Sequence, residues 1–333
     1  MKKYNLNQTS GSMGSKFKIS LDNTLLFRYA YFVSLILVPL LNYFVYGLTH
    51  IELYPLYHVE SILLGLGFWK KPKSFLFLNL SVIIFVRLYF TDSILNVQNF
   101  IILFFVFSIG TLLSVELVKN YLKTNKKKLD VIISLAKTLE SKDPYTRNHS
   151  ENVARYSLLI AREMNFTEKQ CRALYIGGLL HDIGKIGIPE HILFKNGRLT
   201  KEEFEVIKDH PIIGYKTMAH ITSFIENGVL DMVLYHHERV DGKGYPFGLS
   251  GEEIPIVAKI TAIADTFDAM TSNRVYRNKL NFDSVINEIT INKNLQFDSD
   301  IADTFLKILQ REGPNILTKQ IDENVRRNLL IGH

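Results

Sequence analysis

His181-Asp182-Ile183-Gly184-Lys185 follows directly on an apolar run, 174–180, that is typical of a buried helix. Neighbouring side chains on a helix point about 100° apart, so a His-Asp pair at its end can flank one metal ion. The imidazole supplies a neutral nitrogen ligand, and the carboxylate supplies charge and a second oxygen that can bridge to another metal. Lys185, one turn after His181, suits an anionic substrate such as a phosphodiester.

The other histidines bear on this interpretation, because a lone His-Asp pair is more often an ordinary helix end. Of the ten histidines, seven lie between positions 149 and 237. Five of these seven lie in polar contexts next to helix-like segments: His149, His181, His210, His236 and His237. The chain has one cysteine, so its ligands are nitrogen and oxygen, which suits Fe, Mn or Zn rather than a thiolate site. Residues so far apart in sequence must converge by folding.

A second motif runs His236-His237-Glu238-Arg239-Val240-Asp241-Gly242-Lys243-Gly244-Tyr245-Pro246. We expect the glycines at 242 and 244 to allow positive φ and close approach of the backbone to a ligand. Tyr245 offers an aromatic face to a base, and Pro246 stiffens the exit of the loop. A Gly-x-Gly segment alone indicates only a turn, but the preceding histidine pair favours a binding loop. Gly244 and Tyr245 are therefore expected to bind substrate.

Together the two motifs resemble the HD-GYP family of cyclic di-GMP phosphodiesterases, over about residues 130–309. The resemblance implies an all-helical catalytic domain whose first metal ligand, His149, ends a D-x-x-T-x-x-H stretch that begins at Asp143. The complete set of metal ligands that we expect is His149, His181, Asp182, His210, His236, His237 and Asp265. Asp268, Arg274 and Arg277 would bind the substrate, the arginines through its phosphates. A solvated basic turn is the alternative for the two arginines.

The resemblance also bears on the number of metals. Some family members hold three metals and carry an extra carboxylate one turn before the first histidine, where this chain has Tyr145. We therefore expect two divalent ions, with Fe or Mn favoured and Zn as an alternative. Asp182 would bridge them, a hydroxide between them would attack phosphorus in line, and Lys185 would neutralise a non-bridging oxygen. The products expected from cyclic di-GMP are linear pGpG and, after further cleavage, GMP.

The first part of the chain differs in composition. Hydrophobic residues make up 47% of the chain, and the excess lies in four segments near 24–46, 51–69, 74–90 and 97–118. Each reaches or approaches the roughly 20 residues that cross a bilayer. Lysines gather before the first segment, between the second and third, and after the fourth, whereas the other two connections contain no Lys or Arg. This predicts a multi-pass membrane protein with both termini and the catalytic domain in the cytoplasm. The family resemblance implies that the membrane is the bacterial inner or cell membrane.

Charged and polar residues inside these segments carry a further expectation. His58, Glu60 and Arg87 lie deep in them, where polar groups are costly. We expect packing pairs within the bundle, with a sensing site as the sharper alternative. The net charge of +6 comes from lysines beside apolar segments, so the lipid bilayer is the expected partner and a nucleic acid polymer is not.

A connector helix should join the two parts. Apolar residues and one asparagine recur at steps of three and four: Val115, Val118, Leu122, Asn125, Leu129, Ile132, Ala136 and Leu139. This heptad seam predicts a homodimer through a parallel coiled coil, and one amphipathic helix packed on its own domain is the alternative. The expected parts are a disordered cytoplasmic tail (1–20), a membrane region with about four helices (21–118), the connector (119–140), the catalytic domain (141–310) and a C-terminal tail (311–333).

Three other functions compete with hydrolysis of cyclic di-GMP. A related hydrolase could act on a different cyclic dinucleotide, such as mixed GMP–AMP. A catalytically silent receptor would bind the nucleotide without needing a full set of metal ligands. A generic HD-type nucleotidase, with a simpler one-metal site, would not require the second histidine motif. Metal content separates the receptor from the enzymes.

Overall fold

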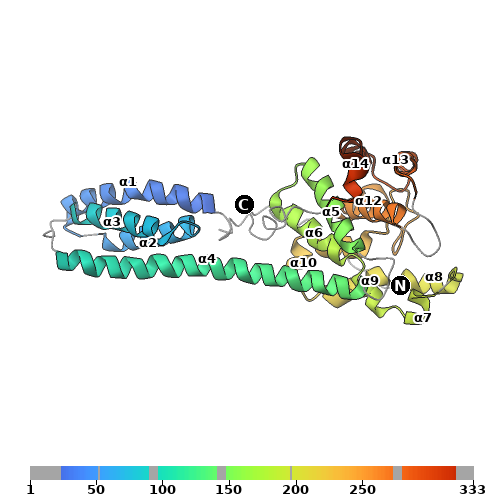
Figure 1. Cartoon of the computed structure of the whole chain (residues 1–333), viewed down its shortest axis with the longest axis horizontal. Coiled ribbons are helices and arrows are strands. Elements are labelled where there is room, and N and C mark those ends of the chain that lie inside the picture. The colour runs from blue at the N-terminus through green and yellow to red at the C-terminus, as the bar shows by residue number, and fades with distance from the viewer. Residues whose placement is uncertain are drawn as a thin grey trace. The chain divides into compact units, whose positions relative to one another are not determined.

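The computed structural model describes residues 24–51, 53–89, 97–140, 148–195, 197–272 and 280–319. Within these ranges the regular elements are helices, joined by loops with two isolated bridges, Asp241 to Ser250 and Lys293 to Phe297 (Figure 1). The all-α prediction is therefore confirmed for the described residues. The described residues divide into two compact units, with the boundary between residues 123 and 124.

The N-terminal unit contains α1 (Thr24–Thr49), α2 (Tyr54–Phe68), α3 (Lys73–Tyr89) and the first part of α4 (Val97–Glu140). Two of these helices, α1 with 26 residues and α4 with 44, are long and apolar enough to cross a membrane. The other two are shorter, with 15 residues in α2 and 17 in α3. Length and composition thus support two of the four expected crossing helices, and the crossing of α2 and α3 stays a prediction.

The polar residues of this unit pack among its helices. The Glu60 side chain is buried, and the His58 ring meets the Phe107 ring edge-on at 4.6 Å between centroids. The Arg87 guanidinium lies 4.3 Å from the centroid of the Tyr54 ring. For His58 and Arg87 these contacts agree with the expected packing within the bundle.

The C-terminal unit surrounds one apolar core. Its longer helices are α5 (His149–Glu163), α6 (Glu168–Leu180), α9 (His210–Met218), α12 (Ile256–Thr271), α13 (Phe282–Ile291) and α14 (Ser299–Glu312). Its shorter helices are η1 (Ile183–Gly187), α7 (Glu190–Leu193), α8 (Lys201–Ile207), α10 (Thr222–Glu226), α11 (Val229–Tyr235), η2 (Gly251–Glu253) and η3 (Gly313–Leu317). Edge-on contacts of Phe267 with Tyr156 at 4.8 Å and with Phe305 at 5.0 Å join α12 to α5 and α14.

The last part of α4 belongs to this C-terminal unit. Leu129 and Ile133 are buried in its core, and Ile132 packs against the same core. This burial is what the alternative of one amphipathic helix on its own domain predicts, because the apolar face of the helix is covered within the chain. The homodimer stays a prediction.

Candidate metal centre

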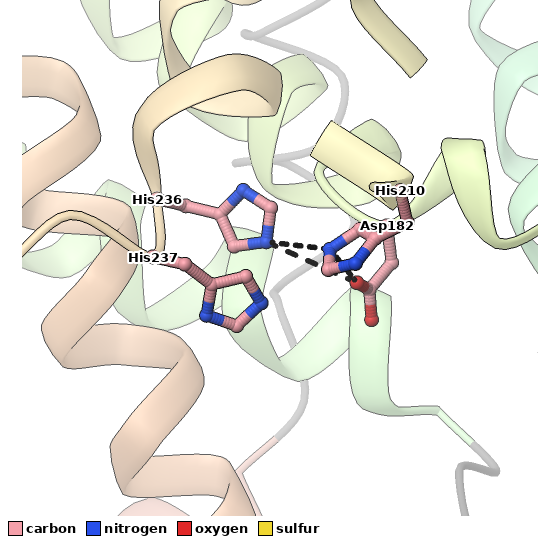
Figure 2. Close-up of side chains that lie close together, drawn as sticks. All are labelled: Asp182, His210, His236 and His237. Carbon is pink, nitrogen blue, oxygen red and sulfur yellow. Dashed lines mark hydrogen bonds and ion pairs between the residues drawn. The ribbon is translucent and has the colours of Figure 1, made fainter. Parts of the chain in front are cut away.

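All seven expected metal ligands converge in the C-terminal unit, and six of them lie at helix ends. His149 opens α5, His181 and Asp182 follow α6, His210 opens α9, His236 and His237 follow α11, and Asp265 lies within α12. They form two groups, in each of which the ligand atoms lie within 4.8 Å of one another: Asp182, His210, His236 and His237 in the first, and His149, His181 and Asp265 in the second. Figure 2 shows the first group.

Glycines allow the helices that carry the ligands to approach closely. A Cβ atom on Gly178 would lie 2.5 Å from the Cα atom of Ala154, so α6 and α5 touch through backbone. A Cβ atom on Gly184 would lie 1.9 Å from the carbonyl oxygen of His210, so η1 packs directly on the start of α9. No Cβ contact is that short in real proteins, and only glycine fits without a shift of the backbone. These two contacts bring Asp182 close to ligands on α5 and α9.

Hydrogen bonds fix the orientation of four histidine rings through their Nδ1 atoms. His149 Nδ1 bonds to a side chain, Asp268 Oδ2, at 2.7 Å. The other three bond to backbone carbonyl oxygens: His181 Nδ1 to Gly178 O at 2.8 Å, His210 Nδ1 to Ile207 O at 2.8 Å, and His236 Nδ1 to Met232 O at 3.0 Å. Carbonyl oxygens only accept, so Nδ1 carries the proton in the last three rings. Each Nε2 is then left with a lone pair, the form in which histidine binds metals.

Two observations show that these lone pairs suit a cation. His210 Nε2 and His236 Nε2 lie 3.3 Å apart, so two acceptors face each other across a buried space. His181 Nε2 is buried and has no hydrogen-bond partner among the described residues. Leaving a buried polar atom unpaired costs free energy, which a metal ion bound at that atom would offset. The residues therefore fit a divalent metal ion.

Asp182 lies between the two groups, and each of its oxygens faces a different one. Oδ1 lies 3.3 Å from His210 Nε2 and 3.9 Å from His236 Nε2. Oδ2 lies 3.3 Å from His181 Nε2 and 3.7 Å from His149 Nε2, and it also accepts a hydrogen bond from Lys185 Nζ. This is the arrangement that a bridging carboxylate requires.

The protonation states of the expected ligands also suit the binding of a metal ion. Burial would raise the pKa of Asp182, but the charge of Lys185 holds it well below its usual range. Burial would likewise raise the pKa of Asp265, but hydrogen bonding to His149 keeps it well below that range. Burial lowers the pKa of His237 to about 3. Ionised carboxylates and neutral imidazoles are the forms that metals bind.

His149 behaves differently from the other rings. Burial would lower its pKa, but hydrogen bonds and charge from Asp265 and Asp268 raise it to about 10. The two carboxylates therefore create a negative site that attracts a cation, and a bound metal ion would take the place of the proton on Nε2.

Asp268 lies buried against His149, and its contact with substrate stays a prediction. Its side chain is buried, its Oδ2 accepts from His149 Nδ1 at 2.7 Å, and its Oδ1 accepts from Asn152 Nδ2 at 2.8 Å. Because both oxygens are used inside the protein, the structure favours orientation of His149 over contact with substrate. Arg274 and Arg277, the other expected substrate contacts, lie outside the described residues, as does Tyr145.

In the loop after His237, the two glycines serve different purposes. Gly242 has φ +74°, as expected, but Gly244 does not have positive φ. Gly244 is needed for another reason, because a Cβ atom there would lie 2.4 Å from the Arg239 backbone nitrogen. The Tyr245 ring stacks on the His237 ring, with 4.5 Å between centroids and 25° between planes, so one of its faces is already covered.

Sequence reasoning missed two residues that support the site. Glu238 is buried, and its carboxylate accepts hydrogen bonds from the backbone nitrogens of Phe247 at 2.8 Å and Leu249 at 2.9 Å, which shapes the loop. Asn152 binds Asp268 from the helix that carries His149. Its position three residues after His149, on the same helix face, was the available indication.

Two openings adjoin the ligands. A cavity of about 50 Å³ is lined by residues that include His149, Asp182 and Lys185. A larger cavity, of about 320 Å³, lies beside His236 and His237. Its other lining residues include Phe204, Lys208, Lys243, Tyr245 and Gln296. Each group of ligands thus borders one of the two cavities.

Comparison with known proteins agrees with this geometry. The family model of the HD domain matches residues 134–301, just over half of the chain. A cyclic di-GMP phosphodiesterase of Thermotoga maritima is 37% identical over 228 residues, which cover 63% of this chain and 62% of that protein. The cyclic di-GMP phosphodiesterase response regulator RpfG of Xanthomonas campestris is 36% identical over 56% of this chain and 49% of its own length.

A third relative, 3'3'-cGAMP-specific phosphodiesterase 1 of Vibrio cholerae, is 34% identical over 55% of this chain and 42% of its own length. The chain thus spans about half of the length of the curated relatives that it matches. The matched residues include every ligand of the two groups and the loop that carries Tyr245. The chain belongs to the HD domain family.

Proposed function

We propose that this protein is a metal-dependent phosphodiesterase that hydrolyses a cyclic dinucleotide, with cyclic di-GMP as the first candidate. The observation that carries the proposal is Asp182, whose two oxygens face two separate, mostly buried groups of ligands. Two ions on one bridging carboxylate are the arrangement used to cleave phosphodiesters by in-line displacement. The names of two similar proteins support this choice of substrate.

The proposed site holds two divalent ions, Fe or Mn by preference, one in each group of ligands. When bound, these ions would supply Lewis-acid activation of the phosphate and of a water molecule. The protein's own side chains stabilise charge and orient the ligands. Lys185, beside Asp182 and part of the lining of the smaller cavity, offsets charge that develops on a non-bridging phosphate oxygen. Asp268 holds the His149 ring in place. The proposed product is linear pGpG.

The larger cavity has room for a part of the substrate away from the bond that is cut. Its lining includes Lys243 and Lys208, and Lys208 Nζ lies 5.8 Å from the centroid of the Tyr245 ring. Ammonium groups attract phosphate, and an aromatic ring offers a surface to a base, so this lining suits a nucleotide. Arg274 and Arg277 stay proposed contacts of the phosphates.

A different cyclic dinucleotide is the second candidate substrate, because one relative is named for 3'3'-cGAMP. The receptor alternative requires that the bound nucleotide is not cut. Membrane anchoring through α1 and α4 belongs to the same proposal, since these two helices have the length and composition for a crossing. A homodimer through the connector helix is also part of the proposal.

The test is turnover by the 333-residue chain purified in detergent without oxygen and loaded with Fe or Mn. We expect cyclic di-GMP to be converted to pGpG, and His181→Ala combined with Asp182→Ala to abolish turnover, because both ion sites lose a ligand. Chromatography of the products, with mixed cyclic GMP–AMP in parallel, identifies the substrate. Tight binding without any product would favour the receptor, and full turnover by the double variant would contradict the metal site.

A further inference from the structure

Helix α5, which begins with His149, is not capped by its own first residues. Asn148 precedes the helix with φ +66°, a left-handed conformation, and its side chain makes no capping hydrogen bond. The cap comes instead from Glu140, the last residue of α4. Glu140 Oε2 accepts from the backbone nitrogen of Asn148 at 3.1 Å, and Oε1 accepts from that of Ser150 at 2.5 Å.

This cap matters because His149 lies between the two backbone nitrogens that Glu140 binds. The first backbone N–H groups of a helix lack partners within the helix, and a carboxylate there both accepts their hydrogen bonds and interacts favourably with the helix dipole. Asn148 holds a backbone conformation that asparagine adopts at some cost, so other contacts must stabilise this turn. Without the Glu140 carboxylate, the first turn of α5 would fray, and the backbone that carries His149 would be held less firmly.

We propose that Glu140 is a positioning residue for the ion held by His149, His181 and Asp265. It acts through the backbone around His149 and does not touch the ion itself. The proposal depends on metal binding, one part of the proposed function, and not on which nucleotide is cut. It also gives α4 a role at the site, because its last residue holds the helix that begins with a metal ligand.

A second contact between α4 and α5 provides a matched control. Lys137 Nζ lies 3.7 Å from Glu151 Oε2, with the two side chains 56% and 29% exposed. Exposed ion pairs of this kind contribute little to stability. Glu151→Gln removes the charge of this ion pair and leaves the hydrogen bonds of Glu140 intact. It therefore separates a general loss of contact between the helices from loss of the cap.

The experiment measures Mn²⁺ binding to the metal-free 333-residue chain in detergent, by calorimetry and by the electron paramagnetic resonance of the bound ion. His149→Ala and His210→Ala first identify which of the two binding steps belongs to which group. We expect Glu140→Ala to weaken the step that His149→Ala removes on the order of tenfold, the loss typical when a group that orients a metal ligand is removed. The step that His210→Ala removes should keep its affinity.

Glu140→Gln should be intermediate, because its amide oxygen can accept one of the two hydrogen bonds but carries no charge. Glu151→Gln should match the wild type. Unchanged Mn²⁺ binding by Glu140→Ala, or an equal loss in both steps that Glu151→Gln reproduces, would overturn the proposal. If Glu140→Ala does not fold, Glu140→Gln decides between these results. Because no nucleotide is used, a failure to hydrolyse cyclic di-GMP would leave this test unaffected.

Discussion

A single carboxylate connects the two groups of ligands. Asp182 Oδ1 faces His210 and His236, whereas Oδ2 faces His149 and His181. Each histidine approaches only one group, so loss of one histidine should affect one ion, but loss of Asp182 should affect both. The charge of Lys185 keeps the Asp182 carboxylate ionised, and the Lys185 ammonium group donates a hydrogen bond to the same Oδ2 atom.

Asp268 provides a prediction that separates two roles. If it orients His149, Asp268→Asn should lower Mn²⁺ affinity by about tenfold to a hundredfold, because an amide accepts the His149 hydrogen bond more weakly. At saturating Mn²⁺ the KM for cyclic di-GMP should then stay the same. Titration of activity with Mn²⁺, followed by substrate kinetics at the highest concentration, distinguishes the roles. A raised KM with normal Mn²⁺ affinity would instead support the substrate contact that we first expected.

Individual residues differ in how far sequence could predict them. His181, Asp182 and Lys185 were predicted from the end of an apolar run and from helical spacing, and the structure places them together. Glu238 could not be predicted in the same way, because its partners are backbone nitrogens of a loop whose path the sequence does not specify. Gly244 was given two possible reasons, positive φ and close backbone approach, because a glycine serves both equally, and only the fold tells them apart.

Among the helical elements, the contact between η1 and α9 is the tightest near the site. Gly184→Ala would place a methyl group 1.9 Å from the His210 backbone oxygen, so the two elements must move apart. We expect a loss of about 1–3 kcal/mol in the free energy of unfolding, as for other overpacked sites, and a loss of Mn²⁺ bound beside His210. Denaturation with urea, with and without Mn²⁺, measures both effects.

Gly187→Ala is the matched control in the same short helix. Its methyl group would lie 2.9 Å from Cγ2 of Ile213, a side-chain atom that can shift, so the loss should be smaller. Equal losses for the two variants would contradict the argument that backbone contact at Gly184 sets the distance between Asp182 and His210.

The α4 helix shows the limit of patterns in a single element. The apolar seam along it was predicted, and residues from it are buried. The same seam suits a partner helix and a domain core equally, because both require one apolar face. The structure covers Leu129 and Ile133 with the core of the chain itself, which periodicity alone does not show.

For the whole molecule, the all-helical class could be predicted because helical patterns dominate and none of the sequence alternates like a strand. The convergence of ligands from positions 149 to 265 could be predicted only through the family resemblance, since chain spacing does not set the packing of five helices. The number of membrane crossings in the N-terminal unit could be predicted less well from the sequence. Segments of 15 and 17 residues lie below the usual length for a crossing, and composition alone does not settle them.

Cysteine labelling tests the four expected crossings. The only cysteine, Cys171, is buried and can be replaced by alanine, after which single cysteines are placed at Gly47 and Lys71. Four crossings put Lys71, in a basic connection, in the cytoplasm, in agreement with the distribution of lysines. A membrane-impermeant maleimide should then label Gly47→Cys in intact cells, and Lys71→Cys only after the cells are permeabilised. If only α1 and α4 cross, both cysteines lie outside and both react. If neither reacts in intact cells, the proposed membrane topology is wrong.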